Sequence, residues 1–456
     1  MSLKSPFDRI GSIKIGISFI MDAELTLVDL KDNITETFAK FEENLNGAGS
    51  SPLKALRAQA LTAFKETTFP TIKHEEWKYT NLRKLLSIPF AWEGVEESQS
   101  TELNPDWYFG LEEANLLVFV NGKFSVNLSK VVDTAFEVTS IAEADGELIE
   151  QHFSKYAKVE SEPFTALNTA FAAEGVFIHV PKGKVVEKPV VLLYINNVQE
   201  KAVFSQPRNL IVVEESAQIN LIENFVSVGA EKSFSNLVSE IVVESNARVN
   251  HYKLQNEQPT VFHIGTTQVL QHRDSYYNNL TFTLAGGLTR NNVNLVLDGE
   301  NCESHLFGLY MMHRQDHVDN HTSVDHKQPH SFSNELYKGI LDDEAKGVFN
   351  GKVYVRQYAQ KTNAFQSNKN ILLSPKASVD TKPQLEIWAD DVKCSHGATT
   401  GAMDEEPLFY LRSRGIGEDK AKALLMHAFA ADLLEEVKIP EVKDHIEKLI
   451  DQRLLV

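Results

Sequence analysis

The stretch IVVEESAQIN at residues 211–220 recurs as IVVESNARVN at residues 241–250, with a constant offset of 30 residues. Recurrence at a period of roughly 20–50 residues is typical of solenoids, because each repeat buries its inner face only against its neighbours. The alternative is a chance resemblance between two strands of a β-sandwich. The repeat favours stacked rungs, and it therefore predicts a parallel β-helix.

The region around this repeat has the composition of strands. From about residue 162 to residue 395, short runs rich in Val, Ile, Leu, Phe and Asn alternate with polar or glycine breaks. Two examples are Val176–Val180 and Val190–Ile195. A weaker echo relates Leu297–Glu300 to Leu341–Glu344. We therefore expect rungs throughout this region.

Both ends of the chain have helical patterns. Apolar residues spaced for one helix face run over Asp32–Asn46, and Ser51-Pro52 marks the start of a second helix. The helical pattern returns over Glu418–Val437 and again after Pro440. We predict a mainly β fold with helices at both ends. The expected division is an N-terminal helical region at 1–100, a mixed strand and helix segment at 101–163, the β-helix core at 164–395 and a C-terminal helical domain at 396–456.

The charge of the chain limits its partners. Its 456 residues carry a formal net charge of -18. Non-specific binding to nucleic acid needs a basic surface, and so does an anionic membrane face, so we expect neither partner. No stretch approaches the ~20 apolar residues that a membrane helix needs.

The first 21 residues allow two interpretations. Lys4 and Arg9 precede the apolar run Ile10–Ile20, as in a signal peptide, but Lys14 interrupts the run and no clear cleavage site follows. The alternative is that translation begins at Met21 and that residues 1–21 are not native or are disordered.

The chain has two cysteines, Cys302 and Cys394. Secreted disulfide-stapled domains use many more, so the count predicts a reducing, cytoplasmic location. Two thiolates cannot hold a four-cysteine cluster. Any metal chemistry must therefore take ligands from histidines or from another subunit.

Familiar catalytic signatures are missing from the sequence. There is no phosphate-binding Gly-Lys loop, no dinucleotide glycine fingerprint and no Gly-x-Ser-x-Gly elbow. A polysaccharide-acting β-helix enzyme remains an alternative, since Asp298, Asp342 and Asp343 could supply carboxylates. The same residues equally suit turns between rungs.

Histidines are concentrated in one segment of the chain. Imidazole is the commonest metal ligand, and neighbouring aspartates would add oxygen ligands. The alternative is a structural or partner-facing role. The residues are His305, His313, His317, His321, His326 and His330, with Asp316, Asp319 and Asp325 between them.

Cys394 and His396 form the second candidate metal site. They are two residues apart, so on an extended strand their side chains point to the same face. A thiolate beside an imidazole is a soft-metal pair that needs two further ligands. The alternative is a buried cysteine next to an unrelated histidine.

Several segments share their sequence with one protein family. The longest are Lys382–Ile387, Cys394–Thr399 and Leu408–Ile416. Together they closely resemble the SufB/SufD family of iron–sulfur cluster assembly scaffold proteins. Ser395-His396-Gly397 stands where SufB has a Glu-His-Glu type sequence, so the resemblance is to the SufD branch. Further segments that look like the family are Glu75–Thr80, Phe164–Phe171, His326–Pro329 and Ser333–Ile340.

The resemblance implies a fold and a set of partners. The fold would be a right-handed parallel β-helix flanked by helical domains, pairing with the SufB paralogue through the β-helices. A homodimer of the isolated chain is an alternative. The C-terminal helical domain would bind SufC, an ABC-type ATPase, so ATP hydrolysis would reside in the partner and this chain would be a non-catalytic scaffold that binds no ATP. The candidate interface residues are Leu408, Phe409, Tyr410, Arg412 and Arg414.

The resemblance also implies a site. His396 is in the position of the family's histidine at the heterodimer interface, and Cys394 is in the position of a nearby cysteine. We therefore expect these two residues to contribute to a transient iron–sulfur cluster that is shared with the partner subunit.

Overall fold

The computed structural model describes most of the chain from Ser51 onward. The described residues are Ile34, Phe38, 41–43, 51–90, 101–144, 146–160, 162–199 and 201–454. The proposed start at Met21 and the signal-peptide interpretation lie outside the described residues. The helix predicted over 32–46 lies partly outside them, and its described residues are helical.

Two long sheets wind around one interior. Apart from the antiparallel pairs β1/β2 and β3/β4 near the N-terminal end, neighbouring strands are parallel. Sheet B contains, in order, β2 (Lys123–Lys130), β1 (Asn115–Val120), β5 (Val190–Asn197), β8 (Gln218–Val228), β10 (Arg248–Asn256), β12 (Tyr276–Ala285), β14 (Glu303–Met312), β16 (Phe332–Leu341), β18 (Asn363–Leu372) and β20 (Lys393–Ala402). Sheet A contains β19 (Ser378–Ile387), β17 (Lys346–Val355), β15 (His317–His326), β13 (Leu288–Leu297), β11 (Val261–Gln271), β9 (Ser233–Val243), β7 (Arg208–Val213), β4 (Val176–Val180) and β3 (Glu137–Ser140), with β6 (Val203–Ser205) beside β9. The chain alternates between the sheets from β7 to β20, which is a parallel β-solenoid as predicted.

The 30-residue repeat is one full rung. Ile211 pairs with Ile241 between β7 and β9, and Ile219 pairs with Val249 between β8 and β10. The prediction of stacked rungs is therefore confirmed. The weaker echo is wrong as a rung repeat, because Leu297 ends β13 in sheet A whereas Leu341 ends β16 in sheet B.

The turns between rungs explain why short polar residues interrupt the strands. Ser216, Asn246, Asp274 and Asn301 each follow a strand of sheet A and adopt a left-handed conformation, with φ between 57° and 61°. Asn and Asp tolerate this region better than other non-glycine residues. Asn246 Nδ2 donates to Ser216 Oγ at 3.0 Å, so successive turns also bind one another.

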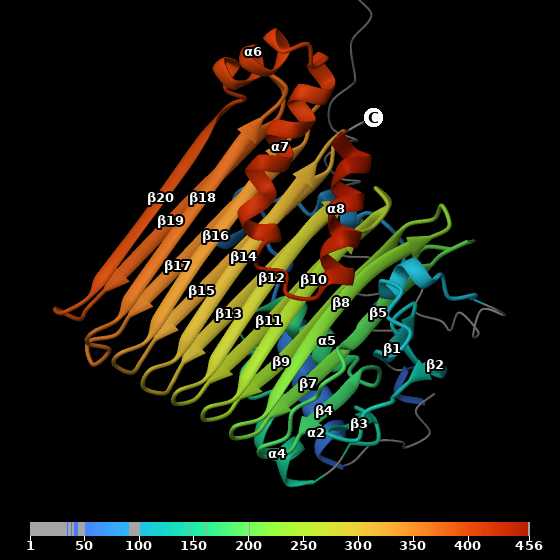
Figure 1. Ribbon diagram of the computed structural model, residues 1–456. Helices are drawn as coiled ribbons and strands as arrows, with labels where there is room; N and C mark the ends of the chain where they lie inside the picture. Colours follow the sequence, from blue (N-terminus) through green and yellow to red (C-terminus); the bar gives the residue numbers. More distant parts are fainter. Residues whose placement is uncertain are drawn as a thin grey trace, which may run out of the picture.

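Helices cover the outer faces of both sheets (Figure 1). Met426 and Leu433 of α7 and Ile446 of α8 pack with Phe282 and Leu309 of sheet B. On sheet A, Phe64 of α2 packs in one cluster with residues of α5, β9 and β11. The helices are α2 (Ser51–Glu66), α3 (Arg83–Leu86), α4 (Glu147–His152), α5 (Pro163–Ala170), α6 (Glu405–Ser413), α7 (Glu418–Leu434) and α8 (Pro440–Leu454), with 3-10 turns at Glu75–Trp77 and Pro105–Tyr108.

The solenoid ends differently at its two termini. The antiparallel strands β2 and β3 are the outer neighbours at the N-terminal end, whereas β19 and β20 are the last members of their sheets. Figure 1 shows these two strands together at one end of the molecule. Among the described residues, no further strand pairs with the outer backbone edges of β19 and β20. None of the helices that the structure describes is both long and apolar enough to pass through a lipid bilayer.

Candidate functional site

His396 ends a column of residues that faces the interior of the solenoid. In a parallel in-register sheet, paired residues point to the same side. Leu306 of this column belongs to the interior core, so His396 also points toward the interior, on the last strand that the structure describes in this sheet. It is exposed there. The column runs through His251, Asn279, Leu306, Glu335, Gln366 and His396.

Cys394 lies beside His396 on the same strand and faces the same way. It pairs with Ala364 of β18 and packs partly against the interior core. Burial raises the pKa of the Cys394 thiol, against a smaller opposing effect of the Ala364 backbone. The thiol is therefore protonated at neutral pH, and a metal would have to displace its proton.

The two residues form at most half of a metal site. Across the part of the chain that the structure describes, no group of three or more His, Cys, Asp or Glu side chains is arranged to hold a metal ion. The prediction that further ligands must come from elsewhere stays a prediction. The position of Cys394 and His396 is compatible with it, since both residues lie on β20, the last described strand of its sheet.

The histidine-rich segment is not one site. His305 lies on β14 in sheet B, His313 and His330 lie in turns, and His317, His321 and His326 lie on β15 in sheet A. The buried ring of His326 contacts Ser333 Oγ at 2.9 Å. These residues are close in sequence, but the winding of the solenoid places them in different sheets and turns.

The aspartates of that segment have cationic or histidine neighbours. Asp319 Oδ2 accepts from Arg290 Nη1 at 2.6 Å, and the Arg290 guanidinium lies 3.8 Å from the centre of the Trp77 ring. Asp325 accepts two hydrogen bonds from Arg356. Asp316 lies 3.4 Å from His313 Nδ1. The structural interpretation of this segment is therefore favoured over the metal-binding one.

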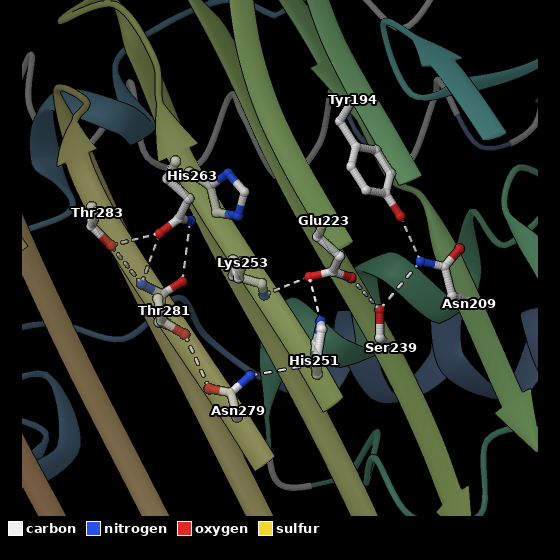
Figure 2. A network of polar contacts seen from close by, with 12 residues as sticks. Tyr194, Asn209, Glu223, Ser239, His251, Lys253, His263, Asn279, Thr281 and Thr283 are labelled. Carbon is white, nitrogen blue, oxygen red and sulfur yellow. Dashed lines mark hydrogen bonds and ion pairs between the residues drawn. The ribbon is translucent and has the colours of Figure 1, made fainter. Parts of the chain in front are cut away.

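The interior of the middle rungs holds a polar network that sequence reasoning missed (Figure 2). The carboxylate of Glu223 lies 3.0 Å from Lys253 Nζ and 3.2 Å from His251 Nε2, and Ser239 Oγ donates to it at 3.4 Å. Burial alone would raise the pKa of Glu223, but the charges of Lys253 and His251 outweigh it and hold the pKa well below its usual range. The sequence does contain a signal for this contact. Glu223 and Lys253 are 30 residues apart, which is the length of one rung, and they pair in register.

Four of the predicted partner-binding residues lie on α6, a helix without a buried residue, and the fifth, Arg414, directly follows it. Phe409 and Tyr410 are 74% and 57% exposed. Arg412 Nη1 lies 3.2 Å from Glu418 Oε2, and the Arg414 guanidinium lies over the Tyr410 ring. Leu408 is half-buried. The helix thus presents two largely exposed aromatic side chains.

The carboxylates considered for a polysaccharide-acting enzyme do not converge. Asp298 follows β13 of sheet A and lies 3.7 Å from Lys327 Nζ. Asp342 and Asp343 follow β16 of sheet B, and Asp343 accepts from the backbone of Arg314. The turn that contains Asp298 leads from sheet A to sheet B, whereas the turn that contains Asp342 and Asp343 leads from sheet B to sheet A. Asp298 therefore lies at the opposite edge of the solenoid from the other two residues. They serve as turn residues.

Comparison with known proteins agrees with this architecture. Residues 194–429 match the description "SUF system FeS cluster assembly, SufBD core domain", and residues 28–192 match "SufBD protein N-terminal region". The chain is 34% identical to the iron-sulfur cluster assembly protein SufD of Escherichia coli, over 87% of this chain and 92% of that protein. It is 32% identical to an iron-sulfur cluster assembly SufBD family protein of Synechocystis sp., over 91% of this chain and 94% of that protein. It is 28% identical to SufD of Bacillus subtilis, over 88% and 94% of the two chains. The chain therefore belongs to the SufB/SufD family of iron–sulfur cluster assembly proteins, and within that family it matches SufD over nearly its whole length.

Proposed function

We propose that this chain is a scaffold subunit that pairs with SufB through the open rung formed by β19 and β20. The observation that carries the proposal is that an interior column of side chains ends in the exposed His396, on the last strand that the structure describes in this sheet. A second solenoid placed there would continue both sheets. It would also enclose the imidazole and the Cys394 thiol between two chains.

The proposal assigns the cluster to the seam between the subunits. His396 and Cys394 would supply one or two ligands, and the partner would supply the others and the main sulfur acceptor. The iron–sulfur cluster is then cargo that is built and passed on. Two cysteines in this chain, neither in a disulfide, fit a reducing cytosol.

Replacing His396 with alanine should leave the complex intact and reduce its cluster content. The side chain is exposed, so folding loses little. Loss of a residue that only orients a metal ligand already costs about 10–100-fold in metal affinity or activity, so loss of a ligand should cost at least as much. We expect a fall of about tenfold or more in iron and acid-labile sulfide per complex, measured on the co-purified subunits after anaerobic reconstitution.

Ser395→Ala is the matched control for this experiment. Ser395 is the exposed neighbour of His396 and points to the other face of β20. Its replacement should leave the iron and sulfide content unchanged. If His396→Ala also leaves that content unchanged, His396 is not a cluster ligand.

We further propose that α6 is the docking element for the SufC ATPase. Exposed aromatic residues are frequent anchors of protein interfaces, and Phe409 and Tyr410 are largely exposed. ATP hydrolysis would then belong to SufC, and this chain would transmit SufC movement from α6 to the neighbouring rung β20.

Replacing Phe409 with serine should weaken capture of SufC without affecting capture of SufB. Truncating an interface anchor costs ~2 kcal/mol or more, which is about a 30-fold loss of affinity. The affinity can be measured by surface-immobilised capture of purified SufC. Tyr358→Ser is the control, since Tyr358 is also an exposed aromatic residue but lies in the turn between β17 and β18. Equal effects of the two variants would show that α6 has no special role.

A further inference from the structure

The rung beneath His396 carries a buried amide that makes no well-formed hydrogen bond. Gln366 of β18 is the register partner of His396 and is only 3% exposed. Neither its Oε1 nor its Nε2 has a hydrogen-bond partner among the described residues. Leaving such a group unsatisfied costs about 1–3 kcal/mol, so a buried orphan of this kind calls for a functional explanation.

A glycine in the facing sheet leaves room for this amide. A Cβ atom at Gly351 of β17 would come within 2.3 Å of Gln366 Nε2, which is closer than real contacts allow. The side chain of Gln366 therefore spans from sheet B to sheet A in the last covered rung. Its amide lies in the interior, one rung before His396.

The next rung supplies a second polar group below the amide. Glu335 of β16 is the register partner of Gln366, and its Oε2 accepts from Thr322 Oγ1 of sheet A at 2.6 Å. Burial raises the pKa of Glu335 to about 7. The Gln366 amide is close enough to oppose that rise in pKa, although it makes no well-formed hydrogen bond there.

His396 lacks the contact that metal-binding histidines usually have. A ligating imidazole almost always donates its second ring N–H to a carboxylate, a carbonyl or water, which fixes the tautomer and the orientation of the ring. The described part of this chain gives the His396 ring no such acceptor. Gln366 Oε1 is an unused acceptor that lies one rung away on the same face.

We propose that Gln366 is the positioning residue for His396. When a partner rung covers the open end, the imidazole, which already lies on the interior face of β20, donates its free ring N–H to Gln366 Oε1. Glu335, which accepts from Thr322, lies beneath the amide in the rung below, and one imidazole nitrogen remains free for a divalent metal ion. This inference rests on the proposed function and adds the residue that orients the ligand.

Cobalt binding to the co-purified complex tests the assignment without relying on cluster yield. Co²⁺ is added as the probe, and its d–d absorption reports affinity and ligand field. Gln366→Leu removes the acceptor and should weaken Co²⁺ binding by about 10–100-fold and shift the absorption band. Gln366→Asn keeps the amide but withdraws it by one methylene. It should weaken binding in the same direction, and it remains informative if leucine disturbs packing.

Gln384→Leu is the matched control. Gln384 also has an unpartnered side-chain oxygen, but it alternates with Pro383 and Leu385 and so faces the outside of β19. Its replacement should not change Co²⁺ binding. Unchanged affinity and band position in both Gln366 variants, alongside loss of binding in His396→Ala, would overturn this inference and leave the proposed function standing. Unchanged binding in His396→Ala would instead remove the metal role of His396 itself.

Discussion

Replacing Glu240 with alanine is expected to destabilise the protein by about 3–5 kcal/mol, because it leaves a buried positive charge without a counter-ion. Glu240 and Arg208 are both fully buried, and Arg208 Nη2 donates to Glu240 Oε2 at 2.6 Å. The other guanidinium nitrogens of Arg208 have no described partner. Arg208 therefore depends on this single carboxylate.

Glu240 also fixes the loop that follows α4. Its carboxylate accepts from the backbone N–H groups of Ser154, Tyr156 and Ala157 at 2.7–2.9 Å. The alanine variant would also leave these three N–H donors without their acceptor. Equilibrium urea unfolding at neutral pH measures the loss. Removing both charges, as in Arg208→Leu with Glu240→Leu, should recover part of it, since the unpaired charge is then gone.

An exposed ion pair of the same length provides the comparison. Lys182 Nζ lies 2.6 Å from Glu215 Oε2, and both side chains are largely exposed. Glu215→Ala should cost no more than about 1 kcal/mol, because water replaces the lost contact. If Glu240→Ala costs as little as Glu215→Ala, then burial does not govern the strength of the Arg208–Glu240 pair.

Proline at position 398 is expected to abolish pairing with SufB while the chain itself stays folded. Lys393 N–H donates to Thr362 of the preceding rung, and hydrogen bonds alternate along a parallel strand. The N–H of Ala398 therefore points to the open edge. Proline removes this donor without breaking a bond to β18, and proline on an edge is a known block to strand addition.

Co-purification of SufB with tagged Ala398→Pro measures pairing, and thermal unfolding of the isolated variant measures its own stability. Ala398→Val is the control, because it keeps the N–H and favours a strand. Recovery of SufB in wild-type amount with the proline variant would show that the partner does not add to β20. Sedimentation of the wild-type chain alone would reveal whether the same edge forms a homodimer.

Much of this architecture could be predicted from the sequence because a solenoid is built from local repetition. The 30-residue offset between Ile211 and Ile241 is the rung length, and it directly gives the register of β7 on β9. Alternation within β20 likewise put Cys394 and His396 on one face before their surroundings were known. The family could be recognised because the segment from Lys382 to Ile416 has a characteristic sequence.

The sequence alone did not decide which distant residues meet across the interior. The echo of Leu297 at Leu341 failed because similar turns occur at both edges, and only the winding assigns each to its sheet. The histidines from 305 to 330 looked like one cluster, but successive strands belong to opposite sheets, so closeness along the chain did not become closeness in space.

Sequence determined the rungs, the strand faces and the family, because these depend on periods and motifs that are read within a few dozen residues. Tertiary structure decided that His396 stands uncovered at the end of an interior column with Gln366 and Glu335 beneath it, and that Glu223 meets Lys253 and His251 inside the solenoid. The physical reason is that burial and pairing across the interior depend on every rung length between the contacting residues. Those lengths vary along the chain, so the columns become visible only when the strands are in register.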